Sequence, residues 1–437
     1  MPTGGQAMSD DRTLVVLLDG RRAGLLTMDN AGRLRFEYDE QWGSAGPATP
    51  LSLSMPVARA VHDDAVVRPF LQGLLPDNER VLERWAKTYH VSAGNPFALL
   101  RHVGEDCAGG VQFVRPERVD AVLAGEGHVD WLDESAVAKR IRRLRQDPAA
   151  WHADHNGQFS LAGAQAKTAL YRDPATGRWG EPVGATPTTH ILKPAVTDSD
   201  DHDLNEHLCL AAARAIGIRA AVTAVEFFDD ERVIVIERYD RVLRDGVIRR
   251  VHQEDMCQAL GVRPEAKYQS EGGPSPETII ALLRAHVTPA SAAAIAVDRF
   301  VDALAVNWVI GGTDAHAKNY SVLLSGNQVR LSPLYDVSSA LPYDEFYLPR
   351  LRMAMKIGGE YGLPAMSSRH WRRFATANGL DPDRLIDRID QLAEALPAAF
   401  ESVAKADSVK ALGSSLPGRL VDRIAARAVE CRAQLRR

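Results

Sequence analysis

The hydrophobic and polar positions in the first part of the chain predict a small α+β domain. Alternating apolar and polar residues up to Tyr38, interrupted by the turn signal Asp19-Gly20, are typical of a three-stranded β-meander. From about residue 66 to 103 the apolar positions recur at helical spacing, and the run "CAGGVQFV" then indicates a short closing strand. We therefore expect a disordered tail at residues 1–11 and an α+β domain at residues 12–118.

A change in the hydrophobic pattern divides the rest of the chain into two parts. After a polar stretch at 145–158 come several β-like runs and one amphipathic helix, whose C-cap we expect at Gly217. Beyond residue 252 the pattern is mostly helical, with one strand-like hairpin at 320–335. Strands with a single helix, followed by a helical half, are the order expected of a bilobal α+β fold. We assign residues 119–150 to a helical connector, 151–240 to an N-terminal lobe and 241–437 to a C-terminal lobe.

Composition and charge narrow the class of protein. With 45% hydrophobic and 25% charged residues, the 437-residue chain is typical of a globular protein, and no apolar run approaches the roughly 20 residues needed to span a bilayer. The net charge of -5 argues against a broad nucleic-acid surface, although it leaves room for a local basic patch. Cys107, Cys209, Cys257 and Cys431 lie far apart without CxxC spacing. This pattern favours reduced thiols in a cytoplasmic protein and weighs against a zinc site.

The stretch "SLAGAQAK" lies between two β-like runs, at 159–161 and 168–171. Its small residues would let backbone N–H groups approach a phosphate, and Lys167 would add positive charge. Taken alone, the stretch is explained better as an ordinary hairpin loop with a glycine at positive φ. Its interpretation therefore depends on the signals that follow it along the chain.

Two charged positions in the next segment have the spacing of a nucleotide site. Lys193 ends the apolar strand "THILKP", and Glu206 lies in the helix that follows. Protein kinases hold the ATP phosphates with such a lysine–glutamate pair, but two unrelated surface charges explain the pattern equally well. The strand "VIVIERYDR" then leads to Glu237, Arg238 and Tyr239, where a connection between lobes would offer backbone groups to an adenine edge. Alone, this would be only a charged strand end.

The segment "NWVIGGTDAHAKNYSVLL" contains four polar side chains in one short loop: Asp314, His316, Lys318 and Asn319. A buried helix is predicted to end at the two glycines before this loop. The D-x-x-x-x-N spacing is the one by which kinases pair a catalytic base with a metal ligand. The predicted hairpin then brings Asp336 back, and Mg²⁺ prefers one or two carboxylates together with phosphate oxygens and water. We therefore interpret the segment as a catalytic loop.

These signals follow one another in the order that a kinase-like phosphotransferase requires, and the same segments resemble the HipA family of bacterial serine/threonine kinases, the toxins of toxin–antitoxin pairs. The similarity covers nearly the whole chain. It lies in "FLQGLLPDNERV", "FSLAGAQAKTAL", "THILKP", "NEHLCL", "HQEDMCQALG" with "KYQSEGGPS", and "GTDAHAKNYS" with "LYDVSSA". It implies a bilobal protein-kinase-like α+β fold with a small N-terminal α+β domain and a mostly helical C-terminal lobe.

The resemblance also implies roles for individual residues. Asp314 would be the catalytic base, assisted by Lys193 and Asn319, while Asn319 and Asp336 would hold Mg²⁺. The ATP-binding residues would be Ala162, Gly163, Ala164, Gln165, Ala166, Lys167, Lys193, Glu206, Glu237, Arg238, Tyr239, His316, Lys318, Asn319, Tyr335 and Asp336. Ser160 matches the serine that family members autophosphorylate, and a phosphate there would add about -1.5 to -2 charge where ATP phosphates should sit.

The leading prediction is thus an ATP- and Mg²⁺-dependent serine/threonine protein kinase toxin that phosphorylates a translation component, such as an aminoacyl-tRNA synthetase. Two alternatives stay open: a small-molecule phosphotransferase on the same fold, and a catalytically inert module that binds the antitoxin. The resemblance implies a helix-turn-helix antitoxin of HipB type as partner. Because the chain is acidic and shows no helix-turn-helix of its own, we expect contact with operator DNA mainly through that antitoxin, and no membrane partner.

Overall fold

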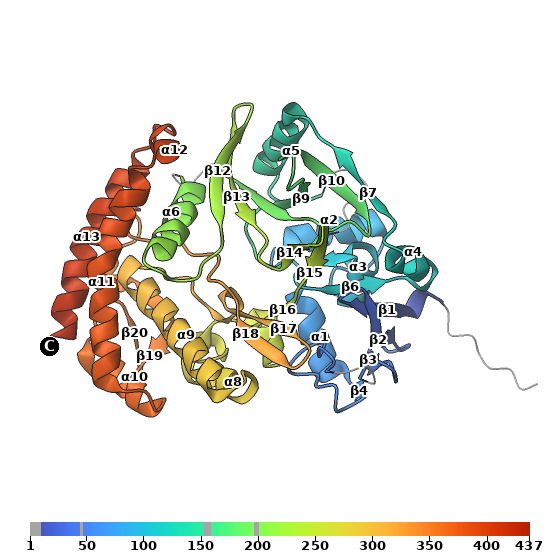
Figure 1. Ribbon diagram of the computed structural model, residues 1–437, viewed down its shortest axis with the longest axis horizontal. Coiled ribbons are helices and arrows are strands. Elements are labelled where there is room, and N and C mark those ends of the chain that lie inside the picture. Colours follow the sequence, from blue (N-terminus) through green and yellow to red (C-terminus); the bar gives the residue numbers. More distant parts are fainter. Residues whose placement is uncertain (1–9, 44–46, 153–158, 196–200) are drawn as a thin grey trace, which may run out of the picture.

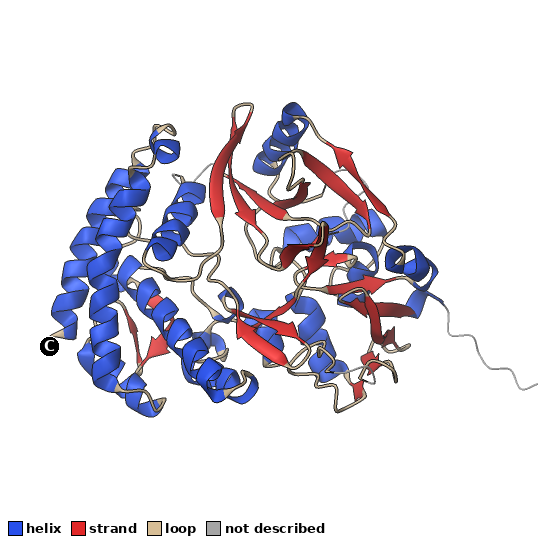
Figure 2. Ribbon diagram, in the orientation of Figure 1, coloured by secondary structure: helices blue, strands red, loops and turns tan. Residues whose placement is uncertain are grey.

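The chain folds into a bilobal α+β structure with an additional domain at its amino-terminal end. The computed structural model describes residues 10–43, 47–152, 159–195 and 201–437. The strands gather in the amino-terminal half and most of the helices in the carboxyl-terminal half, as Figures 1 and 2 show. Most of the tail expected at 1–11, and residues 153–158 of the expected boundary, lie outside the described residues.

The N-terminal domain is a five-stranded antiparallel sheet covered by helices. Its strands are β1 (Thr13–Leu18), β2 (Arg21–Met28), β3 (Leu34–Tyr38), β4 (Val61–His62) and β6 (Val111–Val114), in the order β4-β3-β2-β1-β6. Its helices are α1 (Asp64–Gly73), α2 (Glu79–Tyr89) and α3 (Pro96–Val103). The expected meander forms as β1–β3, and the expected closing strand is β6, which pairs with β1. Asn78 and Asn95 cap α2 and α3 by accepting backbone N–H groups.

The N-terminal lobe is built on a six-stranded sheet in the order β12-β13-β11-β9-β10-β7. Its strands are β7 (Gly127–Trp131), β9 (Thr168–Arg172), β10 (Trp179–Gly184), β11 (His190–Pro194), β12 (Thr223–Phe228) and β13 (Glu231–Glu237). Helices α5 (Glu134–Gln146) and α6 (His202–Ala215) cover opposite faces. Because successive side chains of a strand point to opposite faces, Val233 and Val235 pack with α5, while Ile234 and Ile236 pack with α6.

The segment expected to be a helical connector contributes a strand to this sheet. Residues 119–150 do contain α4 (Val119–Leu123) and α5, but β7 lies between them and pairs with β10 at the sheet edge. Most of its residues are exposed, so the strand carries no apolar alternation that the sequence could reveal. Its place in the sheet comes from backbone pairing with β10 and from the ring of Trp131, which packs edge-on against that of Tyr171 on β9.

The C-terminal lobe packs around the long buried helix α9 (Ala290–Ile310), which ends at Gly311 in the left-handed conformation. Its other helices are α7 (Met256–Ala259), α8 (Pro276–His286), α10 (Ser368–Ala377), α11 (Pro382–Ala404), α12 (Asp407–Lys410) and α13 (Leu416–Leu435). The expected hairpin forms as β17 (Ser321–Ser325) and β18 (Gln328–Leu331), and β16 (His252–Asp255) adds a third strand that the polar sequence did not predict.

Several short elements complete the fold. The remaining strands are β5 (Asp106–Cys107), β8 (Phe159–Ser160), β14 (Arg241–Arg244), β15 (Val247–Arg250), β19 (Arg352–Ile357) and β20 (Glu360–Gly362). Short 3₁₀ turns lie at Asp10–Arg12, Pro116–Arg118, Pro264–Ala266, Gln269–Glu271, Ala317–Asn319 and Leu348–Arg350. None of the helices in the described ranges combines the length and the apolar character needed to cross a lipid bilayer.

The N-terminal domain and the N-terminal lobe share one hydrophobic core. Trp151, Phe159, Leu161 and Ala169 belong to the same buried cluster as the helices of the N-terminal domain. Strand β8, which leads into the glycine-containing stretch, pairs in parallel with β5 of that domain. The glycine-containing stretch is therefore not a hairpin loop, because the strand before it pairs with β5 and the strand after it pairs with β10 and β11.

Candidate active site

A cavity of about 610 Å³ lies where the N-terminal domain and the two lobes meet, a volume typical of sites that bind small molecules. It collects most of the residues that the sequence singled out. The expected residues that line it are Ala162, Gly163, Ala164, Gln165, Lys167, Lys193, Glu206, Glu237, Arg238, Tyr239, Asp314, His316, Lys318, Asn319, Tyr335 and Asp336. Ala166 instead packs against the core of the N-terminal domain, and Ser160 is fully buried beside the cavity.

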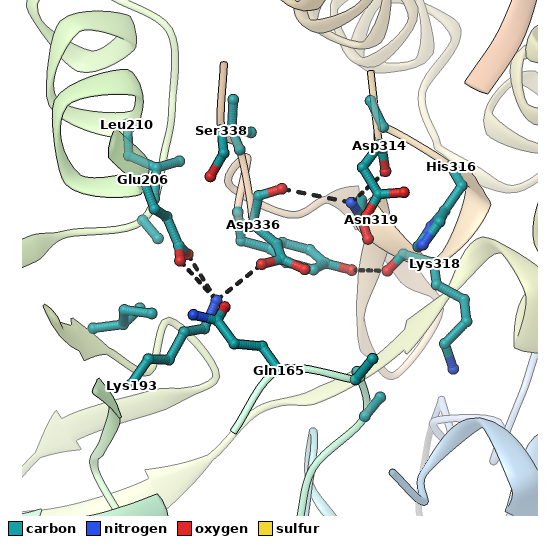
Figure 3. A pocket seen from close by; sticks show the side chains of 18 of the residues that line it. Gln165, Lys193, Glu206, Leu210, Asp314, His316, Lys318, Asn319, Asp336 and Ser338 are labelled. Atoms are coloured by element: carbon teal, nitrogen blue, oxygen red, sulfur yellow. Dashed lines mark hydrogen bonds and ion pairs between the residues drawn. The ribbon is translucent and has the colours of Figure 1, made fainter. Parts of the chain in front are cut away.

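Lys193 on β11 is held between two carboxylates (Figure 3). Its ammonium lies 2.8 and 2.9 Å from the two oxygens of Glu206 on α6, and 2.8 Å from Oδ1 of Asp336. Burial opposes the charged form of the lysine, but Asp336 and Glu206 outweigh it and hold the pKa of Lys193 above its ordinary value. Lys193, in turn, holds the pKa of Asp336 well below its usual range. Lys193 and Asp336 therefore stay charged at neutral pH, whereas burial raises the pKa of Glu206 above its ordinary value.

Asp336 and Asn319, the two expected metal ligands, lie next to each other in the cavity. Asp336 adopts a left-handed backbone conformation, with φ at 56°, which is uncommon for a residue other than glycine and costs conformational energy. The amide nitrogen of Asn319 donates to the backbone carbonyls of Asp314, at 2.8 Å, and Asp336, at 3.5 Å. These bonds fix the amide and leave its side-chain oxygen as an acceptor.

The donor set fits Mg²⁺ in particular. Within the described ranges no group of three or more His, Cys, Asp or Glu side chains could hold a metal ion, so a cation here would need ligands from outside the protein. Mg²⁺ is commonly bound by one or two protein oxygens together with phosphate oxygens and water. Asp336 and Asn319 supply that number of protein oxygens.

Asp314 contacts a residue for which the sequence analysis gave no role. The hydroxyl of Tyr268, in the segment "KYQSEGGPS", donates to Oδ1 of Asp314 at 2.6 Å. Burial and this bond to Asp314 raise the pKa of Tyr268, so the phenol remains a donor. The ring of His316 lies edge-on against Tyr268, with centroids 4.9 Å apart. One carboxylate oxygen of Asp314 is thereby held, while the other can face a substrate hydroxyl.

The glycine-containing stretch forms one wall of the cavity. Gly163 has a φ of 103°, and a Cβ there would lie 2.5 Å from the ammonium of Lys167. That ammonium donates to the carbonyl of Ala162 at 2.6 Å and lies over the ring of Trp151. Burial, and then the nearby charge of Lys193, lower the pKa of Lys167 to about 8.

The end of β13 and the connection after it, residues 237–239, line the cavity, and the first two of their backbone amides are already bonded within the protein. The amides of Glu237 and Arg238 donate to the carbonyls of Val222 and Thr189. In the described part of the chain the amide of Tyr239 has no such acceptor, and the Tyr239 ring lies 5.7 Å from that of Tyr335.

The guanidinium of Arg238 lies in a buried ionic network instead. It donates to both carboxylate oxygens of Asp240, at 3.0 and 2.7 Å, and to the hydroxyl of Thr188 at 2.8 Å. A buried guanidinium needs such partners, which the sequence could not show. Arg238 thus lines the cavity, but its guanidinium and both of its backbone groups are bonded within the protein, since its carbonyl also accepts the amide of Arg241 at 3.1 Å.

Lys318 and Ser160 both point toward the N-terminal domain. The ammonium of Lys318 lies 3.3 Å from Oδ1 of Asp77 and 3.5 Å from Oδ2 of Asp255, and its side chain extends away from Asp336 in Figure 3. The hydroxyl of Ser160 donates to the carbonyl of Leu74 at 2.8 Å. Asp77 lines the cavity, although sequence reasoning did not select it.

Comparison with known proteins identifies the family. The model of the HipA-like C-terminal domain matches residues 159–400, and that of the HipA N-terminal domain matches residues 14–114. The protein Y4mE of Sinorhizobium fredii, named as a presumed kinase, is 36% identical over 95% of this chain and 98% of its own length. The chain belongs to the HipA family. It is a serine/threonine protein kinase of that family, which confirms the resemblance seen in the sequence.

HipA of Shewanella oneidensis matches nearly the whole chain both in sequence and in a solved structure. The serine/threonine-protein kinase toxin HipA of Shewanella oneidensis is 28% identical over 90% of this chain and 89% of its own length. A solved complex of Shewanella oneidensis HipA with HipB and its operator DNA contains a chain that matches with a TM-score of 0.79 and 25% identity. That match covers 96% of this chain and 97% of the other. The expected kinase-like α+β fold is thus confirmed.

Proposed function

We propose that this chain transfers the terminal phosphoryl group of ATP to a protein hydroxyl, with Asp314 as the base. The observation that carries the proposal is the placement of Lys193 between Glu206 and Asp336, in the same cavity as Asp314 and Asn319. A lysine fixed by a helix glutamate is how kinases position the ATP phosphates.

Each of these residues has a part in the transfer. Lys193 would orient the phosphates, and Lys167 would add positive charge at the glycine-containing stretch. The free oxygen of the Asp314 carboxylate would accept the proton of the attacking hydroxyl, while Tyr268 keeps the carboxylate in place. Asn319 and Asp336 would hold Mg²⁺, which neutralises charge on the phosphates when it is bound.

Membership of the HipA family supports a proposal for the substrate and for the partner. We propose a protein of the translation machinery, such as an aminoacyl-tRNA synthetase, as the substrate of this toxin, and Ser160 as its autophosphorylation site. The Shewanella oneidensis relative was solved with HipB and operator DNA, which supports a HipB-type antitoxin as partner here. With a net charge of -5, the chain would meet operator DNA mainly through that antitoxin.

Phosphosite mapping by mass spectrometry after incubation with Mg-ATP tests the proposal. Asp314→Asn removes the base but keeps an acceptor for Tyr268, and Asp387→Asn changes an exposed carboxylate on α11 as a matched control. We expect phosphate on Ser160 in the unmodified chain and in the control. In Asp314→Asn the rate should fall about 10²–10⁴-fold. An undiminished rate in that variant would contradict the role of Asp314, and absence of transfer to Ser160 or to any added protein would contradict the function.

A further inference from the structure

A short segment of the N-terminal domain touches the glycine-containing stretch at three points. This segment, Leu74–Asn78, joins α1 to α2 and has the sequence "LLPDN". The carbonyl of Leu74 accepts the hydroxyl of Ser160 at 2.8 Å. The amide of Asp77 donates to the carbonyl of Gly163 at 3.1 Å, and the side-chain amide of Asn78 donates to the carbonyl of Ala164 at 3.2 Å. Backbone and side-chain groups of one segment thus hold the glycine-containing stretch at its first residue and at two residues of its loop.

The same segment also reaches the catalytic loop. The carboxylate of Asp77 lies 3.3 Å from the ammonium of Lys318, which stands between Asp314 and Asn319 in the sequence, and 3.1 Å from that of Lys267. Burial opposes the charge on Asp77, but the two lysines outweigh it and hold the pKa of Asp77 below its ordinary value. Asp77 is therefore a partly buried ion-pair partner of the catalytic loop.

The hydrogen bonds to the carbonyls of Gly163 and Ala164 determine the direction of the next two backbone amides. In a trans peptide the C=O of one residue and the N–H of the next point in opposite directions. Because the carbonyls of Gly163 and Ala164 point to the segment Leu74–Asn78, the amides of Ala164 and Gln165 point away from it. Backbone amides of such loops are the groups that bind phosphate. The segment thus orients the donors that a nucleotide would need.

We propose that the segment Leu74–Asn78 is a positioning element of the kinase site. It holds the phosphate loop in the conformation that binds nucleotide, and through Asp77 it fixes Lys318 in the catalytic loop. It also sets the exposure of Ser160, whose hydroxyl must leave the Leu74 carbonyl before it can be modified. The inference rests on the proposed function, because it names ATP as the ligand and Ser160 as the modified residue. The contacts between the segment and the loop do not depend on that function.

Asn78→Asp is the variant that isolates the contact with the loop. The side-chain oxygen of Asn78 accepts the amide of Arg80 at 3.1 Å and caps α2, and aspartate caps a helix as well as asparagine does. The substitution therefore keeps the helix start and replaces the donor to Ala164 by a carboxylate oxygen, which the carbonyl of Ala164 repels. Asn95→Asp is its matched control, because Asn95 caps α3 of the same domain in the same way, away from the loop.

Thiol labelling of a Ser160→Cys reporter measures how often the loop opens. The four native cysteines are all buried, so they contribute a low background. In the reporter background we expect Asn78→Asp to raise the labelling rate about 2- to 10-fold, the effect of one lost hydrogen bond on the opening equilibrium. Asn95→Asp should leave the rate unchanged. Equal rates for Asn78→Asp and the parent would overturn the proposal.

Steady-state kinetics of the same variants, with Ser160 intact, separates positioning from a general loss of structure. For Asn78→Asp we expect KM for Mg-ATP to rise about 2- to 10-fold while kcat changes little. A fall in kcat with an unchanged KM would overturn the positioning role. A chain without kinase activity would contradict the proposed function. Thiol labelling needs no phosphoryl transfer, so it would still decide whether the segment Leu74–Asn78 holds the loop.

Discussion

Two buried lysines of the site differ in the pKa of their ammonium groups because their partners differ. Lys193 has two carboxylates within 2.9 Å, which keep its pKa above the ordinary value. Lys167 has a carbonyl and an aromatic ring as its near partners, and burial together with the charge of Lys193 lowers its pKa to about 8. At the residue scale, the two lysines are therefore suited to different tasks: Lys193 is permanently charged, and Lys167 can take up a proton when an anion arrives.

Binding of ATP above pH 8 should therefore take up a proton at Lys167. The free lysine loses its proton as the pH rises through about 8, whereas phosphate charge favours the ammonium form. Affinity should accordingly fall as the pH rises, by about tenfold between pH 7 and pH 9. Isothermal titration calorimetry in two buffers of different ionisation enthalpy measures the uptake. Lys167→Met should abolish it, and an equal uptake in that variant would assign the proton to another group.

The end of α9 is the element that sets the position of the catalytic loop. Gly311 has a φ of 68°, which an L side chain adopts only at a cost. A Cβ on Gly312 would lie 2.1 Å from the side-chain oxygen of Asn307, whose amide nitrogen is held by the carbonyl of Ala303. The helix can thus turn into the loop directly before Asp314 only because both positions lack side chains.

Gly312→Ala should consequently disturb the catalytic loop. Because Asn307 is buried and held, the added methyl group must displace the backbone, and such overpacking typically costs about 1–3 kcal/mol. We expect a lower urea midpoint together with a reduced kcat. Gly418→Ala on α13 is the control, since a Cβ at that position meets nothing within 4 Å. A normal kcat in Gly312→Ala would show that the loop does not depend on this close approach.

At the scale of the whole molecule, a buried ionic network joins the N-terminal domain to the connection after β13, which links the two lobes. Asp106 on β5 accepts from Arg241 at 2.8 Å and from the hydroxyl of Thr188 at 2.6 Å. Arg238 and Arg241 both pair with Asp240 as well. Burial opposes the charge on Asp106, but the surrounding arginines outweigh it and hold its pKa well below the usual range. The domain is thus joined to the kinase lobes by charges as well as by a shared core.

Asp106→Asn should destabilise the whole molecule. Removing one partner of a buried network leaves uncompensated charge on the arginines and typically costs about 3–5 kcal/mol. Urea unfolding at pH 7 measures the loss, with Asp387→Asn as the exposed control. Because the folded pKa is lowered, the stabilisation is present above the pKa of the unfolded carboxyl, about 4, and is lost as the pH falls below it. The difference in the free energy of unfolding between the unmodified chain and Asp106→Asn should therefore shrink at acidic pH. A difference that stays constant with pH would show that it does not come from the charge on Asp106.

The sequence by itself determined which chemical groups occur and in what order. The strand lysine Lys193, the helix glutamate Glu206, the D-x-x-x-x-N loop and the hairpin before Asp336 all lie in segments whose local periodicity sets their secondary structure. Signals of this kind reach over one turn or one strand, so they also indicated the lobes and the N-terminal meander. They missed β7, whose exposed residues carry no apolar pattern.

Only the tertiary structure decided which residues complete the site. Tyr268 bonds to Asp314 across 46 positions, and Asp77 pairs with Lys267 across 190. Arg238 was expected at the nucleotide, and its guanidinium donates to the carboxylate of Asp240. The partner of a buried charge depends on which groups the packed domains bring within a few ångströms, and no local pattern in the chain encodes that proximity.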